Sequence, residues 1–342
     1  MKGRGGRRWS GEEEYSRARR RIFTLESRGG RSRALVEDLP FDEKFQCDPI
    51  ESGLELILRG LEFLCENPTP RRRKHAILNL SAGAEALLRE RLRQEHWSQV
   101  FQDPARATRE AFERGLLPAA GLMDCLLRLE GVCGVEVPAF WRWGIESLAR
   151  RKSLLELRGF VESTPVLVCI ALAAARPFVD SVPPGRLTPS LAAILDAVRG
   201  KLTRLEGQVT EALRRIGTQH AGASLLNCPN CRLEGTLIVR GGPKCLFCGY
   251  SGWPEDLAAE YALDFFPDED RFIYRCPACD RDALLDVGSP DEDPWYVCFA
   301  CSRSWELGGL AFCAWCDQPF EPPEGSPDEE YCPACRRGSR EP

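Results

Sequence analysis

The sequence predicts a helical region followed by three small cysteine-rich modules with short β-hairpins. Three observations predict this fold class. Apolar residues recur at helical spacing through residues 41–182, and a longer heptad-like stripe follows over 188–218. Six Cys-x-x-Cys pairs come after residue 227. We therefore expect a helical bundle, one long helix, and three tandem modules at 225–262, 272–308 and 311–338.

The Cys-x-x-Cys pairs carry the clearest chemistry of the chain. One such turn places two thiolates within reach of an ion, and a second turn completes the tetrahedral four-sulfur shell of a structural zinc site. Successive pairings enclose 13, 18 and 15 residues, which is long enough for a hairpin. The predicted ligands of three zinc ions are Cys228, Cys231, Cys245, Cys248, Cys276, Cys279, Cys298, Cys301, Cys313, Cys316, Cys332 and Cys335.

Pairing of neighbouring turns minimises the loop-closure entropy of each zinc ribbon. Interleaved pairing, such as Cys298/Cys301 with Cys313/Cys316, is the alternative, and sequence alone does not decide between the two. Disulfides are disfavoured because the chain shows no apolar signal segment. Redox-active dithiols are disfavoured because the pairs lack a strand–helix context. With four thiolates bound, each site is closed to water and therefore structural.

Charge is distributed unevenly along the chain. The first 33 residues carry 11 basic and 4 acidic side chains, whereas residues 221–342 carry 10 basic and 22 acidic ones. Nucleic acids bind cationic surfaces, so the acidic ribbons are poorly suited to RNA and favour an unidentified protein partner. Aromatic residues in the ribbons are either partner anchors or the small core that such modules need. They are Trp253, Tyr274, Trp295, Trp305 and Trp315.

The amino-terminal residues 1–40 are predicted to be a disordered basic tail, because glycines interrupt them and no hydrophobic period is present. An alternative is that residues 1–35 do not belong to the native protein and that synthesis begins nearer Val36. The longest apolar run, Val166 to Ala175, is too short to cross a bilayer. We expect a cytoplasmic protein without membrane contact.

Six helices are predicted before residue 182, over 50–66, 69–96, 105–115, 120–131, 138–160 and 164–180. Thr69 before Pro70 caps the second helix. Four cations in its first turn oppose the helix dipole, so they form either a solvated edge or a phosphate patch for RNA. They are Arg71, Arg72, Arg73 and Lys74. The cysteines outside the pairs are expected to pack as small hydrophobes. They are Cys47, Cys65, Cys125, Cys133 and Cys169.

A stripe of apolar residues runs along the long helix at alternating intervals of four and three. Such a stripe is typical of a coiled-coil seam. Its residues are Leu191, Leu195, Val198, Leu202, Leu205, Val209 and Ile216. The seam either pairs with a second copy in a homodimer or lies along the chain's own bundle. Gly200 and Gly207 weaken a free-standing helix.

Two helical segments, Asp48–Leu54 (DPIESGL) and Ala76–Leu88 (AILNLSAGAEALL), resemble bacterial HEPN-like proteins, in which an all-helical domain precedes Cys-x-x-Cys ribbons. The phrases Cys245–Tyr250 (CLFCGY) and Tyr296–Cys301 (YVCFAC) are similar to the ribbons of that family. The resemblance covers about residues 41–336. It implies a bundle that is often dimeric and, in active members, a metal-independent ribonuclease with an Arg-x(4–6)-His motif.

The chain departs from that motif. The helix in which the motif is expected reads RKSLLELR from Arg151 to Arg158 and contains no histidine. The bare spacing recurs at Arg91/His96 and Arg215/His220, and Arg89 and Arg214 give second permitted spacings, all outside that helix. We therefore assign no catalytic residue. No phosphate-binding loop, dinucleotide fingerprint or zinc-protease motif is present either.

Two functions from different classes follow. The first is a non-catalytic zinc-binding scaffold or adaptor, with a degenerate HEPN-like bundle and acidic ribbons for protein contacts. The alternative is an RNA-binding or RNA-cleaving HEPN protein in a defence or toxin pathway, active as a metal-independent endoribonuclease and bound to RNA outside the ribbons.

Overall fold

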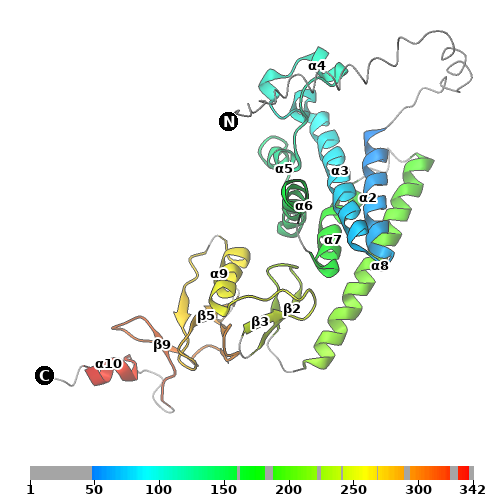
Figure 1. Cartoon of the computed structure of the whole chain (residues 1–342). Helices are drawn as coiled ribbons and strands as arrows, with labels where there is room; N and C mark the ends of the chain where they lie inside the picture. The colour runs from blue at the N-terminus through cyan, green and yellow to red at the C-terminus, as the bar shows by residue number, and fades with distance from the viewer. Residues whose placement is uncertain are drawn as a thin grey trace, which may run out of the picture. The chain divides into compact units, whose positions relative to one another are not determined.

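The computed structural model describes residues 48–159, 162–181, 188–221, 225–239, 242–267, 269–288, 293–323 and 330–338. The tail predicted for residues 1–40 and the thiol of Cys47 lie outside the described residues. Within the described part, helices occupy the chain as far as Gln219, and small antiparallel sheets follow (Figure 1).

The helical region is built on the pair α2 (Pro49–Cys65) and α3 (Pro70–Glu95). Asp48 caps α2, because its Oδ1 accepts hydrogen bonds from the backbone N–H groups of Ile50 at 2.8 Å and Glu51 at 3.1 Å. Thr69 caps α3 in the same way, as its sequence position predicted.

The further elements of the region are two 3₁₀ turns and five helices. They are Trp97–Val100, Pro104–Arg106, α4 (Arg109–Arg114), α5 (Leu122–Gly131), α6 (Ala139–Leu157), α7 (Thr164–Asp180) and α8 (Pro189–Gln219). The helices predicted from periodicity are found with their ends shifted by at most four residues. The largest difference is the segment 105–115, where a 3₁₀ turn replaces the first turn of the predicted helix.

The long helix α8 packs along its own chain. It lies against α2 and α7, which in turn contact α3 (Figure 1). The seam residues in the core that α8 shares with these helices are Leu191, Leu195, Val198, Leu202, Leu205 and Val209, and Ile216 is buried outside that core. Of the two arrangements that the spacing allowed, the structure shows the intramolecular one.

The described residues of the carboxyl-terminal half contain three small antiparallel sheets. The first has the order β1 (Leu225–Asn227), β2 (Glu234–Val239), β3 (Gly242–Cys245). The second has the order β4 (Ile273–Arg275), β5 (Asp282–Asp286), β6 (Tyr296–Cys298), β7 (Ser304–Trp305). The third pairs β8 (Ala311–Phe312) with β9 (Pro319–Phe320), and the short helix α10 (Pro333–Gly338) follows. These are the short hairpins that the Cys-x-x-Cys spacing predicted.

A helix that the sequence reasoning missed, α9 (Pro254–Phe265), lies between the first and second sheets. Pro254 occupies its first turn, and Leu257 and Tyr261 belong to the buried face that contributes to the core around β5. The predicted first module, 225–262, includes most of this helix. The helix contacts both modules: it contributes to the core around β5, and its Asp264 pairs with Arg232 of the first module. Modules this small have little apolar surface of their own to bury.

None of the described helices combines the length and the apolar character needed to span a bilayer.

Helices α2 and α3 pack closely because glycines lie at their contact, and a substitution there should lower stability. A Cβ on Gly83 would lie 2.7 Å from the carbonyl oxygen of Gly53 and 3.0 Å from the backbone nitrogen of Ile57. Gly83→Ala should therefore lower the free energy of unfolding by about 1–3 kcal/mol, since the backbones must separate. Urea unfolding followed by far-UV circular dichroism measures this change.

The matched control is Gly200→Ala in α8, where a Cβ would meet open space. This change should raise the free energy of unfolding by about 0.5–1 kcal/mol, because it reduces the backbone freedom of the unfolded chain. Equal effects of the two substitutions would contradict the close packing of α2 on α3.

Candidate metal centres

The twelve cysteines of the Cys-x-x-Cys pairs form three groups of four. In each group the sulfur atoms all lie within 4.8 Å of one another. The groups are Cys228/Cys231/Cys245/Cys248, Cys276/Cys279/Cys298/Cys301 and Cys313/Cys316/Cys332/Cys335, which we call site 1, site 2 and site 3. The cysteines are therefore grouped in sequential order and not interleaved, and each group could hold a metal ion.

The sulfur separations fit a tetrahedral ion. Cys228 and Cys248 are separated by 3.7 Å between Sγ atoms, Cys276 and Cys301 by 3.8 Å, and Cys316 and Cys332 by 3.9 Å. A tetrahedron with metal–sulfur bonds of about 2.3 Å has edges of about 3.8 Å. The described cysteines are all free thiols. The donor set and its dimensions thus match a four-thiolate centre.

Local backbone geometry makes each Cys-x-x-Cys turn. In all six turns the carbonyl oxygen of the first cysteine accepts a hydrogen bond from the N–H group four residues later, at 2.7–3.1 Å. In five turns that fourth residue adopts a left-handed conformation, with φ between 55° and 77°; these residues are Arg232, Gly249, Asp280, Ser302 and Asp317. The sixth turn continues into α10 instead.

Backbone donors also point at the sulfurs. The N–H group of Cys248 lies 3.4 Å from the Sγ atom of Cys245, and the N–H groups of Ala278 and Ala300 are equally close to the Sγ atoms of Cys276 and Cys298. Such donors stabilise negatively charged sulfur. The backbone geometry of these turns therefore favours the thiolate form of the cysteines even without a metal ion.

The thiols of one group differ in pKa, because each hydrogen bond between two of them favours the thiolate on one sulfur and the thiol on the other. The hydrogen bond with Cys298 lowers the pKa of Cys276 to about 5. The same contact raises the pKa of Cys298, and burial of that thiol is the second cause. In site 3 the pKa of Cys335 is raised to about 12, mainly by a hydrogen bond with Cys332 and secondly by burial. Four thiolates this close require a cation. Metal uptake therefore releases protons, and the affinity of each site falls as the pH is lowered.

Site 1 belongs to the core of the helical bundle. Its four cysteines are buried and form one apolar cluster with residues of α2, α3 and α5–α8. Cys231 and Cys169 of α7 belong to the same buried cluster, and interaction with the Cys169 thiol is the largest cause that raises the pKa of Cys231. A Cβ on Gly235 of β2 would lie 3.8 Å from the side chain of Leu213 in α8. A metal ion in site 1 would therefore brace the bundle as well as the ribbon.

Site 2 and site 3 have cores of their own. Around site 2, Phe299 and Leu284 are fully buried together with the apolar face of α9. Among the described residues, the buried core of site 3 consists of Cys313, Phe320 and Cys332. A side-chain hydrogen bond of 2.9 Å from Trp305 Nε1 to Glu321 joins the second module to the third.

Some of the aromatic residues of the ribbons are buried in the core, and others are exposed as a partner anchor would be. Trp305 is buried, and Tyr274 and Trp295 are half-buried in the core of site 2. Trp253 and Trp315, by contrast, are 73% and 80% exposed.

Two of the four cations from Arg71 to Lys74 form hydrogen bonds within the helical region, and the other two are exposed. Arg72 bonds the carbonyl oxygen of Glu66, and Arg73 bonds Thr164 Oγ1 at 3.3 Å, whereas Arg71 and Lys74 are exposed.

The two histidines of the spacing matches lie at helix ends, because His96 follows α3 and His220 follows α8. His96 caps the 3₁₀ turn that follows α3, where its Nδ1 accepts a hydrogen bond from the N–H group of Ser98 at 3.3 Å. Arg91 bonds Glu95, and Arg215 bonds Glu211. On α6, Arg151 is 4% exposed and bonds Glu162.

Among the cysteines outside the pairs, Cys65, Cys125 and Cys169 are buried and Cys133 is half-buried. The sequence predicted that these cysteines pack as small hydrophobes, but it did not predict the interaction of Cys169 with Cys231. No sequence signal points to that contact, because the two residues are 62 positions apart and meet only when the first ribbon packs on α7.

No protein family, no curated protein and no solved structure matches this chain. The metal centres are therefore assigned from the donor set and its geometry.

The different surroundings of site 1 and site 3 lead to a prediction on metal removal. Cys228→Ser should lower the thermal midpoint of the helical signal, because site 1 lies in the core of the bundle. Cys313→Ser should leave that midpoint unchanged, because site 3 contributes only a small core of its own. Each substitution should remove one of three bound metal equivalents. Circular dichroism and metal analysis provide the two measurements, and an equal loss of helical stability would refute the difference.

Proposed function

We propose that the chain is a non-catalytic zinc-binding scaffold whose acidic ribbons contact a protein partner. Four cysteine ligands at tetrahedral spacing favour zinc among the common metals, and a shell of four thiolates leaves no open position for chemistry. Each site then has a structural role, and function must lie on the surfaces that the sites hold in place.

The exposed tryptophans of the ribbons carry this proposal. Trp315 lies at the tip of a Cys-x-x-Cys turn and is 80% exposed, although small modules bury aromatic residues wherever they can. The backbone N–H of Ala314 donates to the carbonyl oxygen of Glu330 at 2.8 Å, which brings the half-exposed Tyr331 close to the same turn. Exposed aromatic side chains on a rigid support are typical anchors of protein interfaces.

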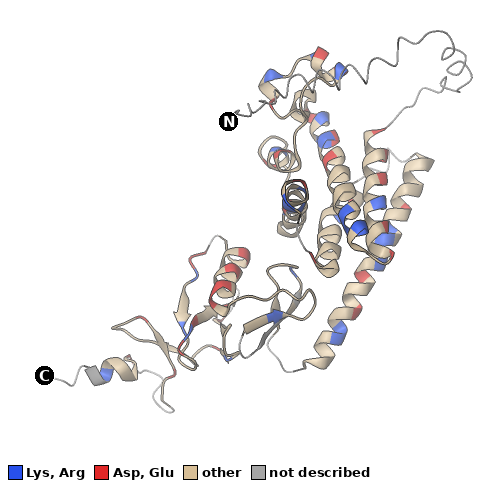
Figure 2. Ribbon diagram, viewed as in Figure 1, with Lys and Arg blue, Asp and Glu red and all other residues tan. Residues whose placement is uncertain are grey.

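Charge supports a protein partner over a nucleic acid. Figure 2 shows acidic residues in red along the ribbon of α9, and the acidic residues of this helix are Glu255, Asp256, Glu260 and Asp264. Arg281 bonds Glu255 in a bidentate pair at 2.8 Å, and Arg232 pairs with Asp264, so two cations of this half are already committed to its own carboxylates. A phosphate backbone finds few available cations there.

We further propose that the bundle is of the HEPN-like type. The two segments that carry the resemblance include Gly53 and Gly83, and these glycines allow α2 and α3 to pack closely. The helix expected to carry the ribonuclease motif uses Arg151 in a buried ion pair with Glu162, which supports a structural role for that arginine. Burial lowers the pKa of Arg151 despite this carboxylate.

A test of the scaffold proposal compares tryptophan variants in affinity capture. Trp253→Ala with Trp315→Ala should lower recovery of a specific partner by at least about tenfold, because each exposed anchor contributes strongly to an interface. Leu157→Ala on α6 is the control, since Leu157 is 82% exposed on the bundle. Zinc content should be unchanged in all variants. If the double variant recovers the same proteins in the same amounts, the tryptophans are not anchors.

A second function, RNA binding by the helical region, is favoured by the exposure of Arg71 and Lys74 at the start of α3. Under this alternative, Arg71→Gln with Lys74→Gln should weaken binding of a single-stranded RNA and reduce its dependence on salt. Arg109→Gln, at the start of α4, serves as a control.

Cleavage of total RNA by the purified protein, abolished in His96→Ala or His220→Ala, would contradict the scaffold proposal and support a HEPN-type ribonuclease.

A further inference from the structure

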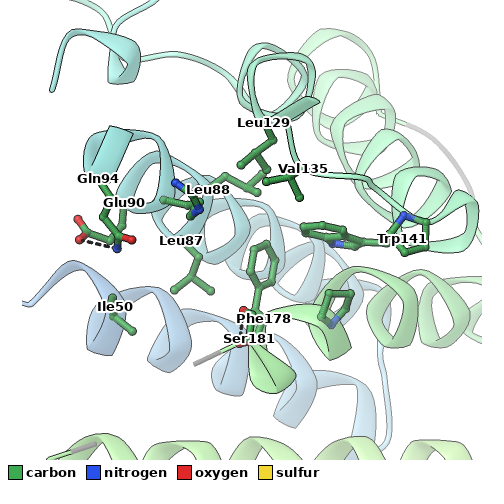
Figure 3. A pocket seen from close by; sticks show the side chains of 13 residues that line it. Ile50, Leu87, Leu88, Glu90, Gln94, Leu129, Val135, Trp141, Phe178 and Ser181 are labelled. Atoms are coloured by element: carbon green, nitrogen blue, oxygen red, sulfur yellow. Dashed lines mark hydrogen bonds between the residues drawn. The ribbon is translucent and has the colours of Figure 1, made fainter. Parts of the chain in front are cut away.

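The helical bundle contains a cavity of about 510 Å³ bounded by α2, α3, α5, α6 and α7. In Figure 3, Leu87 and Leu88 of α3 and Leu129 of α5 face the same space as Trp141 and Phe178. The rings of Trp141 and Phe178 meet edge to face, with centroids 5.7 Å apart, and form one wall. The volume falls in the range of about 300–1,000 Å³ that is typical of small-ligand pockets.

The interior of this cavity is apolar. Nine of its thirteen described lining residues are apolar, and Leu88 and Leu129 are almost completely buried. Water gains few hydrogen bonds in such a space, so an aliphatic or aromatic group is the favoured occupant.

The polar residues of the cavity are not equivalent. Glu90 is buried, and its carboxylate accepts hydrogen bonds from Arg93 Nε at 2.6 Å and Nη2 at 2.7 Å. Its charge is therefore compensated by the protein itself, which leaves little attraction for a cationic ligand. Arg91 pairs with Glu95 at 2.7 Å, but both side chains are substantially exposed. Exposed pairs of this kind are weak, so the guanidinium of Arg91 can exchange Glu95 for another carboxylate.

We propose that this cavity binds a small organic carboxylate with an aliphatic or aromatic body. The carboxylate lies at Arg91, and the body packs between Leu88 and the wall of Trp141 and Phe178. None of the described lining residues is a cysteine, so this site is separate from the metal centres and from the proposed partner surface of the ribbons.

The test is calorimetric titration of the zinc-loaded full chain with decanoate, and separately with decanol, below the concentrations at which they aggregate. Decanoate should bind saturably, with one molecule per chain. Val135→Trp, which fills the cavity, should weaken decanoate binding by at least about tenfold, since the apolar contacts of the ligand are lost. Val132→Trp is the matched control, because Val132 is exposed and lies three residues away outside the lining.

The head-group assignment is tested by Arg91→Gln. This change should weaken decanoate about tenfold and leave decanol unaffected, because only the carboxylate loses a charged hydrogen bond. Arg114→Gln breaks a similar exposed pair, with Glu110 on α4, and should change neither titration.

Three results would overturn the proposal. They are the absence of saturable decanoate binding to the unaltered chain, unchanged binding in Val135→Trp, and equal binding of decanoate by Arg91→Gln and the unaltered chain. Should Val135→Trp fail to fold, Ser181→Trp replaces it. Ser181 lies at the exposed mouth of the cavity, where a large side chain obstructs entry without entering the core.

Discussion

Four thiolates held within 4.8 Å of one another repel strongly unless a cation lies between them, and the carboxyl-terminal half is organised around three such groups. The cores there are small, and in site 3 two of the three buried residues are themselves cysteines. An ion that satisfies the sulfurs would therefore supply much of the free energy that a larger core supplies in other domains. Site 1 extends this dependence into the helices, because its cysteines share an apolar cluster with α7 and α8.

The modules form a connected series within the described part of the chain. Helix α9 follows the first sheet but buries Tyr261 against Phe299 of the second module, with ring centroids 5.5 Å apart. The second module continues into the third through Tyr274 and Phe312, 5.0 Å apart, and through the bond of Trp305 to Glu321. Aromatic contacts of this kind order neighbouring modules relative to one another. The exposed Trp253 and Trp315 are then presented from a supported surface, which is what an interface anchor requires.

A few charged residues of the helical region are buried, and two of them, Glu85 and Arg151, form ion pairs between different segments. Glu85 is buried and bonds both Arg89 and Lys152, so it ties α3 to α6. Arg151 of α6 is buried and pairs with the half-buried Glu162, which lies after the end of this helix. Buried ion pairs are costly to break, because the remaining charge loses its partner. The same region keeps an apolar cavity beside Trp141, which is the ligand site proposed above.

The sequence by itself determined the helices before residue 220, the Thr69 cap and the twelve paired cysteines, whereas the structure decided that the cysteines group sequentially. Helical periodicity, Asp48, Thr69 and the Cys-x-x-Cys spacing are local signals, and local hydrogen bonds enforce them. Tertiary structure decided which partner each surface meets. It placed the α8 seam on the chain's own α2 and α7, recruited α9 to the second module, brought Cys169 to Cys231, and left Trp315 exposed while Trp305 was buried. These outcomes depend on packing between residues far apart in the chain, and the period of an apolar stripe does not specify what will cover it.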